Sequence, residues 1–224
     1  MGSLRSPDQG WDLCPSQSHC GWAKSCHLLL SLLLAWRNFL LPENPDVVTL
    51  DPITAHPELV LSKDLRSMKH GPACQNLTDH TRRFSHWHCV LGKERFREGR
   101  HCWEVEVKGE VGGDSWWGVG VARESVERKR RVDLRPEEGI WAVDRYEGQF
   151  RALTSPPTPL SLSPLPRRIL VCLDCTQGLV TFLNADTGGE IFTFSPVSFR
   201  RETLRPWFLL ETEETQLCLR GSTC

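Results

Sequence analysis

A strict alternation of side chains is the feature that most constrains how this chain can fold. The stretch CWEVEVK places Trp103, Val105 and Val107 at every second position, with Glu104 and Glu106 between them. Successive side chains of an extended strand point to opposite faces, so the apolar residues share one face and the glutamates share the other. The pattern predicts a half-buried antiparallel strand with its glutamates toward solvent.

The same period of two returns a few residues later, in SWWGVGVA. Trp117, Val119 and Val121 share one face of this second predicted strand. Gly118 and Gly120 share the other face. We expect that glycine face to let bulky tryptophan side chains cross over the strand.

The glycine pair also suggests a second interpretation, as part of a dinucleotide-binding loop. That motif needs a third glycine three positions after the second one, and a helix behind it. Arg123 stands at the third position, and no helical pattern follows. The sequence therefore favours a structural role for the two glycines.

Short strand-like segments separated by turn signals continue along the chain at intervals of roughly ten residues, which is typical of a β-sandwich or barrel. They are VVTL (47–50), LVLS (59–62), GIWAVDR (139–145), RILVCLD (168–174), LVTFLNA (179–185) and IFTFS (191–195). The run SPPTPLSLSPLP (155–166) holds five prolines, and it predicts an extended surface connection. The expected fold is all-β, with two antiparallel sheets.

Residues 1–45 have a different character. We expect a disordered leader that ends in a short apolar helix, LLLSLLLAWRNFLL (28–41). Its unbroken apolar core is far shorter than the about 20 residues of a membrane-spanning helix, and it begins too late for a good signal peptide. No transmembrane span is predicted. A remnant of a longer helical or membrane-proximal region is the alternative.

Charge and cysteine spacing exclude two classes of function. The chain has 27 Lys and Arg against 28 Asp and Glu, and this balance favours neither nucleic acid nor an anionic membrane as partner. The ten cysteines show no zinc-finger spacing, since the CxxC of Cys172 and Cys175 lies in a predicted strand with no second pair at the right distance. Reduced thiols in a cytosolic protein are expected.

One charged segment, residues 123–138, allows several interpretations. Four consecutive cations, Arg128 to Arg131, suggest a phosphate-reading patch or a nuclear import signal. Acidic residues on both sides neutralise them, so a solvated loop is favoured.

The chain contains none of the local motifs of a hydrolase, a metalloprotease or a P-loop enzyme. Glu104 and Glu106 are explained by the solvent face of a strand. His86 and His88 alternate on a strand and suggest a ligand pair, yet no third ligand lies near them in the sequence, so we expect a surface pair. No catalytic residue, metal ligand or cofactor is predicted.

Three blocks then occur in an order that resembles the PRY–SPRY domains of tripartite-motif (TRIM) and butyrophilin proteins. The blocks are VTLDPITAHPELVLSKDLRSM (48–68), RHCWEVEV (100–107) and VCLDCTQGLVTFLNA (171–185). The resemblance implies one domain over residues 46–220, with a PRY part at 46–99 and a SPRY part at 100–220. It departs from the family at Cys175, where an aromatic tyrosine is usual.

The resemblance implies a bent, concanavalin-like sandwich that binds its partner through loops at one end, where function is expected on a rigid scaffold. Matching the family's loops gives a set of candidate partner-binding residues. They are Arg66, Lys69, Trp117, Asp144, Arg145, Tyr146 and Phe199. For Trp117, ordinary packing is an equally good explanation.

The function that the resemblance implies is non-catalytic recognition of a protein or peptide, in innate immunity or in ubiquitin-linked substrate recognition. The RING zinc ligands of TRIM proteins are missing, so ligase activity is not expected of this chain. The alternative is a butyrophilin-like sensor of a small phosphorylated, anionic ligand, to which His88, Arg145 and Arg151 contribute. The expected location is the cytoplasm, or the cytoplasmic side of a membrane in a longer butyrophilin-like form.

Overall fold

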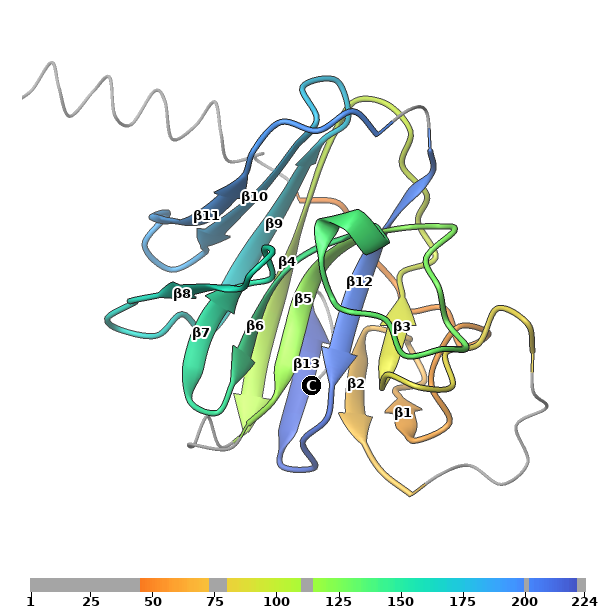
Figure 1. Ribbon diagram of the computed structural model, residues 1–224. Coiled ribbons are helices and arrows are strands. Elements are labelled where there is room, and N and C mark those ends of the chain that lie inside the picture. Colours follow the sequence, from red (N-terminus) through yellow and green to blue (C-terminus); the bar gives the residue numbers. More distant parts are fainter. Residues whose placement is uncertain (1–44, 73–79, 110–114, 200–201, 221–224) are drawn as a thin grey trace, which may run out of the picture. The chain divides into compact units, whose positions relative to one another are not determined.

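The computed structural model describes residues 45–72, 80–109, 115–199 and 202–220. Within these ranges the chain forms thirteen strands and one 3₁₀-helix, η1 (Pro136–Glu138) (Figure 1). The predicted leader and apolar helix lie outside the described residues, apart from Pro45. Among the described residues, no helix is long and apolar enough to cross a membrane.

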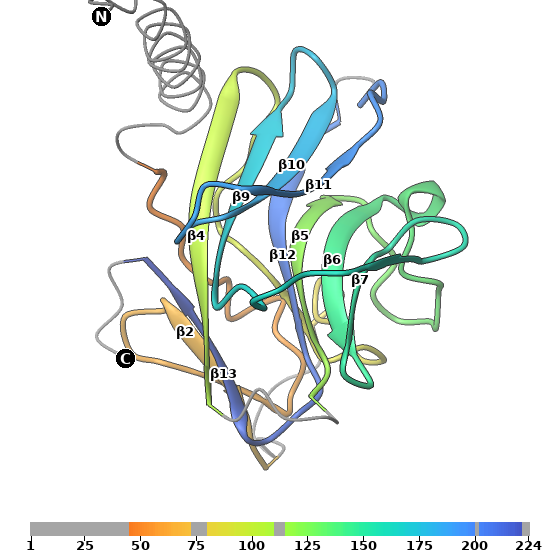
Figure 2. The same cartoon turned by 90° about the vertical axis from the view of Figure 1, so that its left-hand side faces the viewer.

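The strands form two sheets, and every pairing in them is antiparallel. The seven-stranded sheet has the order β1 (Leu59–Leu61), β2 (Ser67–His70), β13 (Thr215–Leu219), β4 (Arg100–Gly109), β9 (Arg168–Asp174), β10 (Leu179–Asn184) and β11 (Glu190–Phe194). The six-stranded sheet has the order β3 (Cys89–Leu91), β12 (Leu204–Leu210), β5 (Trp117–Arg123), β6 (Ile140–Tyr146), β7 (Gln149–Ala152) and β8 (Thr158–Leu160). Figure 2 shows the sheets as two layers, which confirms the predicted all-β fold.

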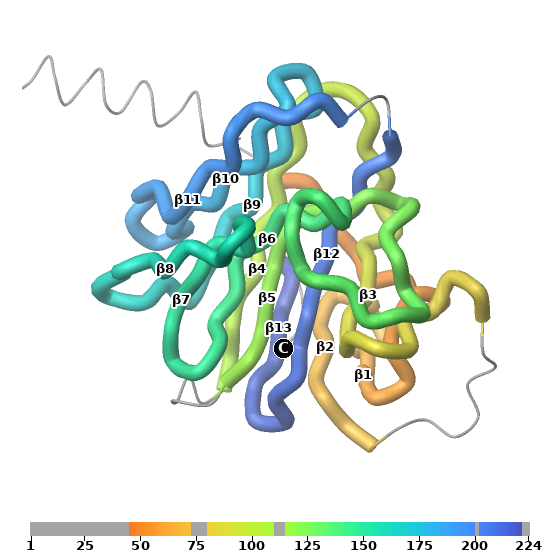
Figure 3. Tube along the Cα trace, viewed as in Figure 1, coloured from red at the N-terminus to blue at the C-terminus, as the bar shows by residue number. Residues whose placement is uncertain are grey.

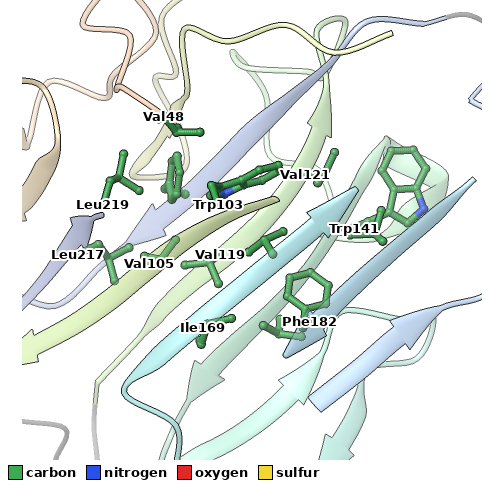
Figure 4. Packing of buried hydrophobic residues seen from close by; sticks show 14 of the residues in the cluster. Val48, Trp103, Val105, Val119, Val121, Trp141, Ile169, Phe182, Leu217 and Leu219 are labelled. Atoms are coloured by element: carbon green, nitrogen blue, oxygen red, sulfur yellow. The ribbon is translucent and has the colours of Figure 1, made fainter. Parts of the chain in front are cut away.

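The main core lies between the sheets, and the alternation in β4 builds one side of it. Trp103, Val105 and Val107 are at most 2% exposed and pack against apolar residues of both sheets (Figure 4). Glu104 and Glu106 are half-buried on the opposite face, where they pair with cations. The predicted register of this strand is confirmed.

A second apolar cluster lies on the outer face of the six-stranded sheet, under residues 80–88 and 124–139. Figure 3 shows the segment between β5 and β6 passing in front of β12. The buried members are Phe84, Cys89, Leu91, Ala122, Val126, Ile140, Ala142, Leu153, Trp207 and Leu209. A Cβ on Gly118 would stand 3.2 Å from the ring of Trp207, so a tryptophan does cross the glycine face of β5 as expected.

Strand β12, between β3 and β5, is fully buried although it contains Pro206, which has no N–H to donate to its neighbour. The N–H of Gly92 donates to the carbonyl of Pro206 at 2.8 Å, and the return bond cannot form. Instead, Nε of Arg205 donates to the carbonyl of Gly92 at 2.7 Å. A Cβ on Gly92 would lie 2.8 Å from the Pro206 ring, so glycine is needed there. The three residues together allow a proline in a central strand.

Three expectations require correction. VVTL is not a strand and contributes one isolated bridge, Leu50 to Gly92. The proline-rich connection contains the short strand β8. Arg128 is not solvated: it is 8% exposed, and its guanidinium donates to the carbonyl of Arg82 and lies over the Phe84 ring.

The expectation of reduced thiols is also wrong for one pair of cysteines. Cys102 on β4 and Cys172 on β9 are directly opposite each other, with their Cα atoms 4.2 Å apart, and they form a disulfide. The two residues are 70 positions apart in the sequence, so only the strand register brings them together. Cys89 and Cys175 are free thiols.

Candidate partner-binding site

Three aromatic side chains form a row on the outer face of the six-stranded sheet. Trp87 precedes β3, Trp116 precedes β5, and Tyr146 ends β6. The ring centroids of Trp87 and Trp116 are 5.6 Å apart, and those of Trp116 and Tyr146 are 4.8 Å apart, both edge to face. Such contacts favour a fixed ring geometry. We call these three residues the aromatic row.

An arginine covers each end of the aromatic row. The guanidinium of Arg131 lies 5.5 Å from the ring centroid of Trp87, and that of Arg151 lies 4.4 Å from the ring centroid of Tyr146. Both distances are those of cation–π contacts. The row therefore presents apolar faces between two positive charges.

A buried carboxylate lies beside the row. Asp144 is fully buried, and its two oxygens accept hydrogen bonds from Nε and Nη2 of Arg151 at 3.0 and 2.6 Å. Burial raises the pKa of Asp144, and the contact with Arg151 offsets this only in part. The same contact raises the pKa of Arg151. The charged pair is thus held in a partly desolvated position.

All of these groups except Tyr146 line a pocket of about 340 Å³, which is at the small end of ligand-binding pockets. The lining residues are Trp87, Trp116, Arg131, Asp133, Leu134, Arg135, Asp144, Arg151, Leu153, Thr154, Ser155, Pro156 and Pro157. The lining mixes aromatic and aliphatic surface with charges of both signs. It suits an apolar side chain whose neighbours carry polar or charged groups.

The structure separates the predicted site residues. Asp144 lines the pocket, and Tyr146 lies on the same face of β6 two residues further on. Arg145 lies between them on the opposite face and is 6% exposed. Trp117 and Phe199 belong to the main core, at 1% and 6% exposure. We therefore leave the last three residues out of the candidate site.

The first-block residues lie on the other sheet. Lys69 is an exposed residue of β2, and Arg66 lies just before that strand. Neither residue lines the pocket. The structure does not bring them together with Asp144 and Tyr146.

Sequence reasoning missed Trp87 and Trp116, and one signal was available for the second. The alternation in β5 turns Trp117 inward, so its neighbour Trp116 must point outward. An outward tryptophan is unusual enough to mark a contact surface. For Trp87 the local sequence offers no such signal, since the contacts of this residue come from segments far along the chain.

A rigid sandwich that presents aromatic and charged groups around a shallow pocket is the arrangement of a binding module. Comparison with known families agrees: the model of the SPRY-associated PRY domain matches residues 48–96, and that of the SPRY domain matches residues 100–222. The chain therefore belongs to the PRY–SPRY family, whose domain is a protein-interaction module of the TRIM and butyrophilin type.

Relatives of both types are similar in sequence. Butyrophilin subfamily 1 member A1 of Homo sapiens is 46% identical over 163 residues, which cover 73% of this chain and 30% of that protein. The E3 ubiquitin-protein ligase TRIM15 of Sus scrofa is 46% identical over 176 residues, which cover 78% of this chain and 37% of that protein. The chain thus spans about a third of the length of these curated relatives.

Two solved structures share the fold. The crystal structure of the TRIM65 PSpry domain superposes with a TM-score of 0.66 at 22% identity, over 93% of this chain and all of that one. The stonustoxin structure gives a TM-score of 0.65 at 27% identity, over 78% of this chain and 27% of that one. At 22% identity, the TRIM65 likeness supports the fold alone.

Proposed function

We propose that the chain is a non-catalytic recognition module, and that it binds a protein or peptide partner through the pocket beside the aromatic row. The observation that carries the proposal is the row itself, Trp87, Trp116 and Tyr146, with an arginine at each end. Tryptophan, tyrosine and arginine are the residue types that dominate binding hot spots. Their rigid rings offer contact area at a small loss of conformational entropy.

The pocket favours a peptide segment with one large apolar side chain. That side chain would contact the rings, and the polar groups of the segment would meet Arg131, Arg135 and the Asp144–Arg151 pair. Charges around an apolar contact act mainly on partner choice and on the rate of encounter. The module supplies no catalytic step in this scheme, and the purified chain is expected to show no ubiquitin ligase activity.

The biological setting follows from the relatives. Several of them are named as E3 ubiquitin-protein ligases, which supports a role in ubiquitin-linked substrate recognition. Innate immunity and the cytoplasm belong to the same proposed setting. Because the cytoplasm is reducing, the disulfide between Cys102 and Cys172 would be reduced to two thiols in that setting.

A small phosphorylated ligand is a second candidate, because Arg131, Arg135 and Arg151 all line the pocket. Asp144 pairs with Arg151, and Asp133 pairs with Arg135 at 3.3 Å. Two of the three cations are therefore already neutralised, which favours the peptide. Of the residues expected to hold such a ligand, Arg151 lines the pocket, whereas His88 and Arg145 do not.

The test is selection of peptides from a random display library on the full chain, followed by affinity measurement. The double variant Asp144→Ala with Tyr146→Ala should weaken the selected peptides by about thirtyfold or more. Lys69→Ala, on the other sheet, is the matched control and should leave the affinity unchanged.

Three results would count against the peptide proposal. One is a selection without any enriched peptide. Another is a set of peptides that bind the double variant as well as they bind the wild type. The third is binding of inorganic pyrophosphate that Arg135→Ala weakens, in a protein that binds no peptide. That result would support the phosphorylated ligand instead.

A further inference from the structure

A cluster of imidazoles and carboxylates lies apart from the recognition pocket. His56 and Glu58 precede β1, and His88 immediately precedes β3. One potential ligand atom from each lies within 4.8 Å of those of the other two. None of the three residues lines the pocket. We propose that His56, Glu58 and His88 form a binding site for Zn²⁺.

The separation of the ligand atoms suits that ion. Nε2 of His88 lies 3.3 Å from Oε2 of Glu58. Zinc bonds of about 2.0–2.1 Å in a tetrahedron place neighbouring ligand atoms roughly 3.3 Å apart. These two side chains therefore already stand at the ligand-to-ligand distance of a tetrahedral site, and the ligand atom of His56 lies within 4.8 Å of both.

The outer contact of His88 is one that zinc-binding histidines usually have. A ligating histidine holds its second ring nitrogen against a carboxylate or a carbonyl. Nδ1 of His88 lies 2.8 Å from Oε2 of Glu211. Nδ1 of His56 accepts the N–H of Glu58 at 3.2 Å. That hydrogen bond uses the lone pair of Nδ1, so His56 has to give up the N–H of Glu58 before it can bind the ion.

A fourth donor is at hand. Nε2 of His70 on β2 lies 3.4 Å from the same Oε2 of Glu58, and its ring centroid is 4.9 Å from that of His88. Three imidazoles and one carboxylate are a donor set for zinc, whereas calcium and magnesium prefer oxygen ligands alone. Glu58 is 39% exposed and provides the path from solvent.

The position of the site connects it with the aromatic row. His88 directly follows Trp87, and the N–H of Glu211 donates to the carbonyl of Trp116 at 2.9 Å. A metal ion here would join the segment before β1, in the PRY part, to β3 and to the end of β12. It would thereby restrict the backbone on which two of the three rings stand.

The experiment is a Zn²⁺ titration of the full, tag-free chain, with Co²⁺ as a spectroscopic probe of tetrahedral nitrogen and oxygen ligation. The wild type should bind one ion through this cluster, and its melting temperature should rise with zinc concentration. Glu58→Gln and His88→Gln should each weaken that ion by tenfold or more. Glu211→Gln, which removes a supporting contact, should weaken it by about 10–100-fold.

His86→Gln is the matched control, because His86 is exposed and lies two residues from His88. It should bind zinc as the wild type does. The proposal is overturned if the wild type binds no zinc. Near-ultraviolet circular dichroism should first show that Glu58→Gln and His88→Gln are folded. The proposal is equally overturned if these folded variants keep the wild-type affinity for zinc. The ion would then be held elsewhere, for example by cysteines. A uniform loss in all four variants would also overturn it.

Discussion

Two ion pairs on the six-stranded sheet have opposite patterns of burial. In the first, the arginine is inside: Arg205 is fully buried, and its partners Asp51 and Glu124 are 10% and 30% exposed. In the second, the acid is inside: Asp144 is fully buried, and Arg151 is 19% exposed. The arginine is thus the buried partner in the first group, and the carboxylate is the buried partner in the second.

The pKa directions separate the two pairs. Burial alone would raise the pKa of Asp51 and of Glu124, but hydrogen bonds hold both pKa values below their usual range. Asp51 accepts hydrogen bonds from Arg205 and from the backbone of Ile53. Glu124 accepts hydrogen bonds from Arg95 and Arg205. Burial raises the pKa of Asp144, and Arg151 does not overcome it. Folding thus favours the charged forms of Asp51 and Glu124, whereas it disfavours the charged form of Asp144.

The contrast suggests a different role for each group. Arg205 also supplies the donor that Pro206 lacks, so its charge is tied to the sheet itself. Burial disfavours the charged form of Asp144 beside the pocket, and perturbed acids of that kind gather at functional sites. We infer that the Arg205 group is structural and that the Asp144 group is part of the recognition surface.

The largest expected effect is that of Arg205→Met. It leaves Asp51 without its partner and the Gly92 carbonyl without a donor, so the free energy of unfolding should fall by about 3–5 kcal/mol. Arg95→Ala is the control: Arg95 also pairs with Glu124 but is 50% exposed, and its loss should change stability by at most about 0.5 kcal/mol. Urea unfolding measures both. An equal loss of unfolding free energy in the two variants would contradict the structural role of Arg205.

A smaller effect is expected at the second pair. Arg151→Met leaves the buried Asp144 carboxylate unpaired and should lower the free energy of unfolding by about 1–3 kcal/mol. Adding Asp144→Asn removes that charge, so the double variant should recover most of the loss. A double variant as unstable as Arg151→Met alone would show that Asp144 is not the source of the effect.

The pH dependence should differ in sign between the two regions. Asp51 and Glu124 have lowered folded pKa values, so their stabilisation is present above the ordinary values of 3.8 and 4.5 and is lost as the pH falls below them. Asp144 has a raised folded pKa, so its contribution falls as the pH rises above 3.8.

Thermal melts of the wild type and Asp144→Asn across this range test the difference. The advantage of Asp144→Asn over the wild type should grow as the pH rises and then level off. Asp51→Asn should show the reverse, with its disadvantage largest near neutral pH. Parallel curves for all three proteins would contradict the assignment.

The sequence was sufficient to predict the sandwich and the inward face of β4, because a period of two is a local property. It was not sufficient for contacts made by residues far apart in the chain. Pro206 argues against a central strand until Gly92 and Arg205 are placed beside it. His88 has no ligand nearby in the sequence, and the fold brings His56 and Glu58 to it.

The same limit applies to the candidate site. Asp144 and Tyr146 were predicted by matching family loops, yet Trp117 and Phe199, predicted in the same way, lie in the core. Loop matching places a residue in a segment but does not say which face of a strand it occupies. The alternation of inward and outward side chains does give the face, and it indicates that Trp116 points outward.

The central claim is that Trp116 binds the partner and contributes little to the fold. The most direct test measures the unfolding free energy and the affinity for a selected peptide on the same Trp116→Ala protein. The account predicts a loss of affinity of about thirtyfold or more. It also predicts that the free energy of unfolding falls by no more than about 1 kcal/mol. A folded Trp116→Ala protein that binds the peptide with the wild-type affinity would contradict the claim.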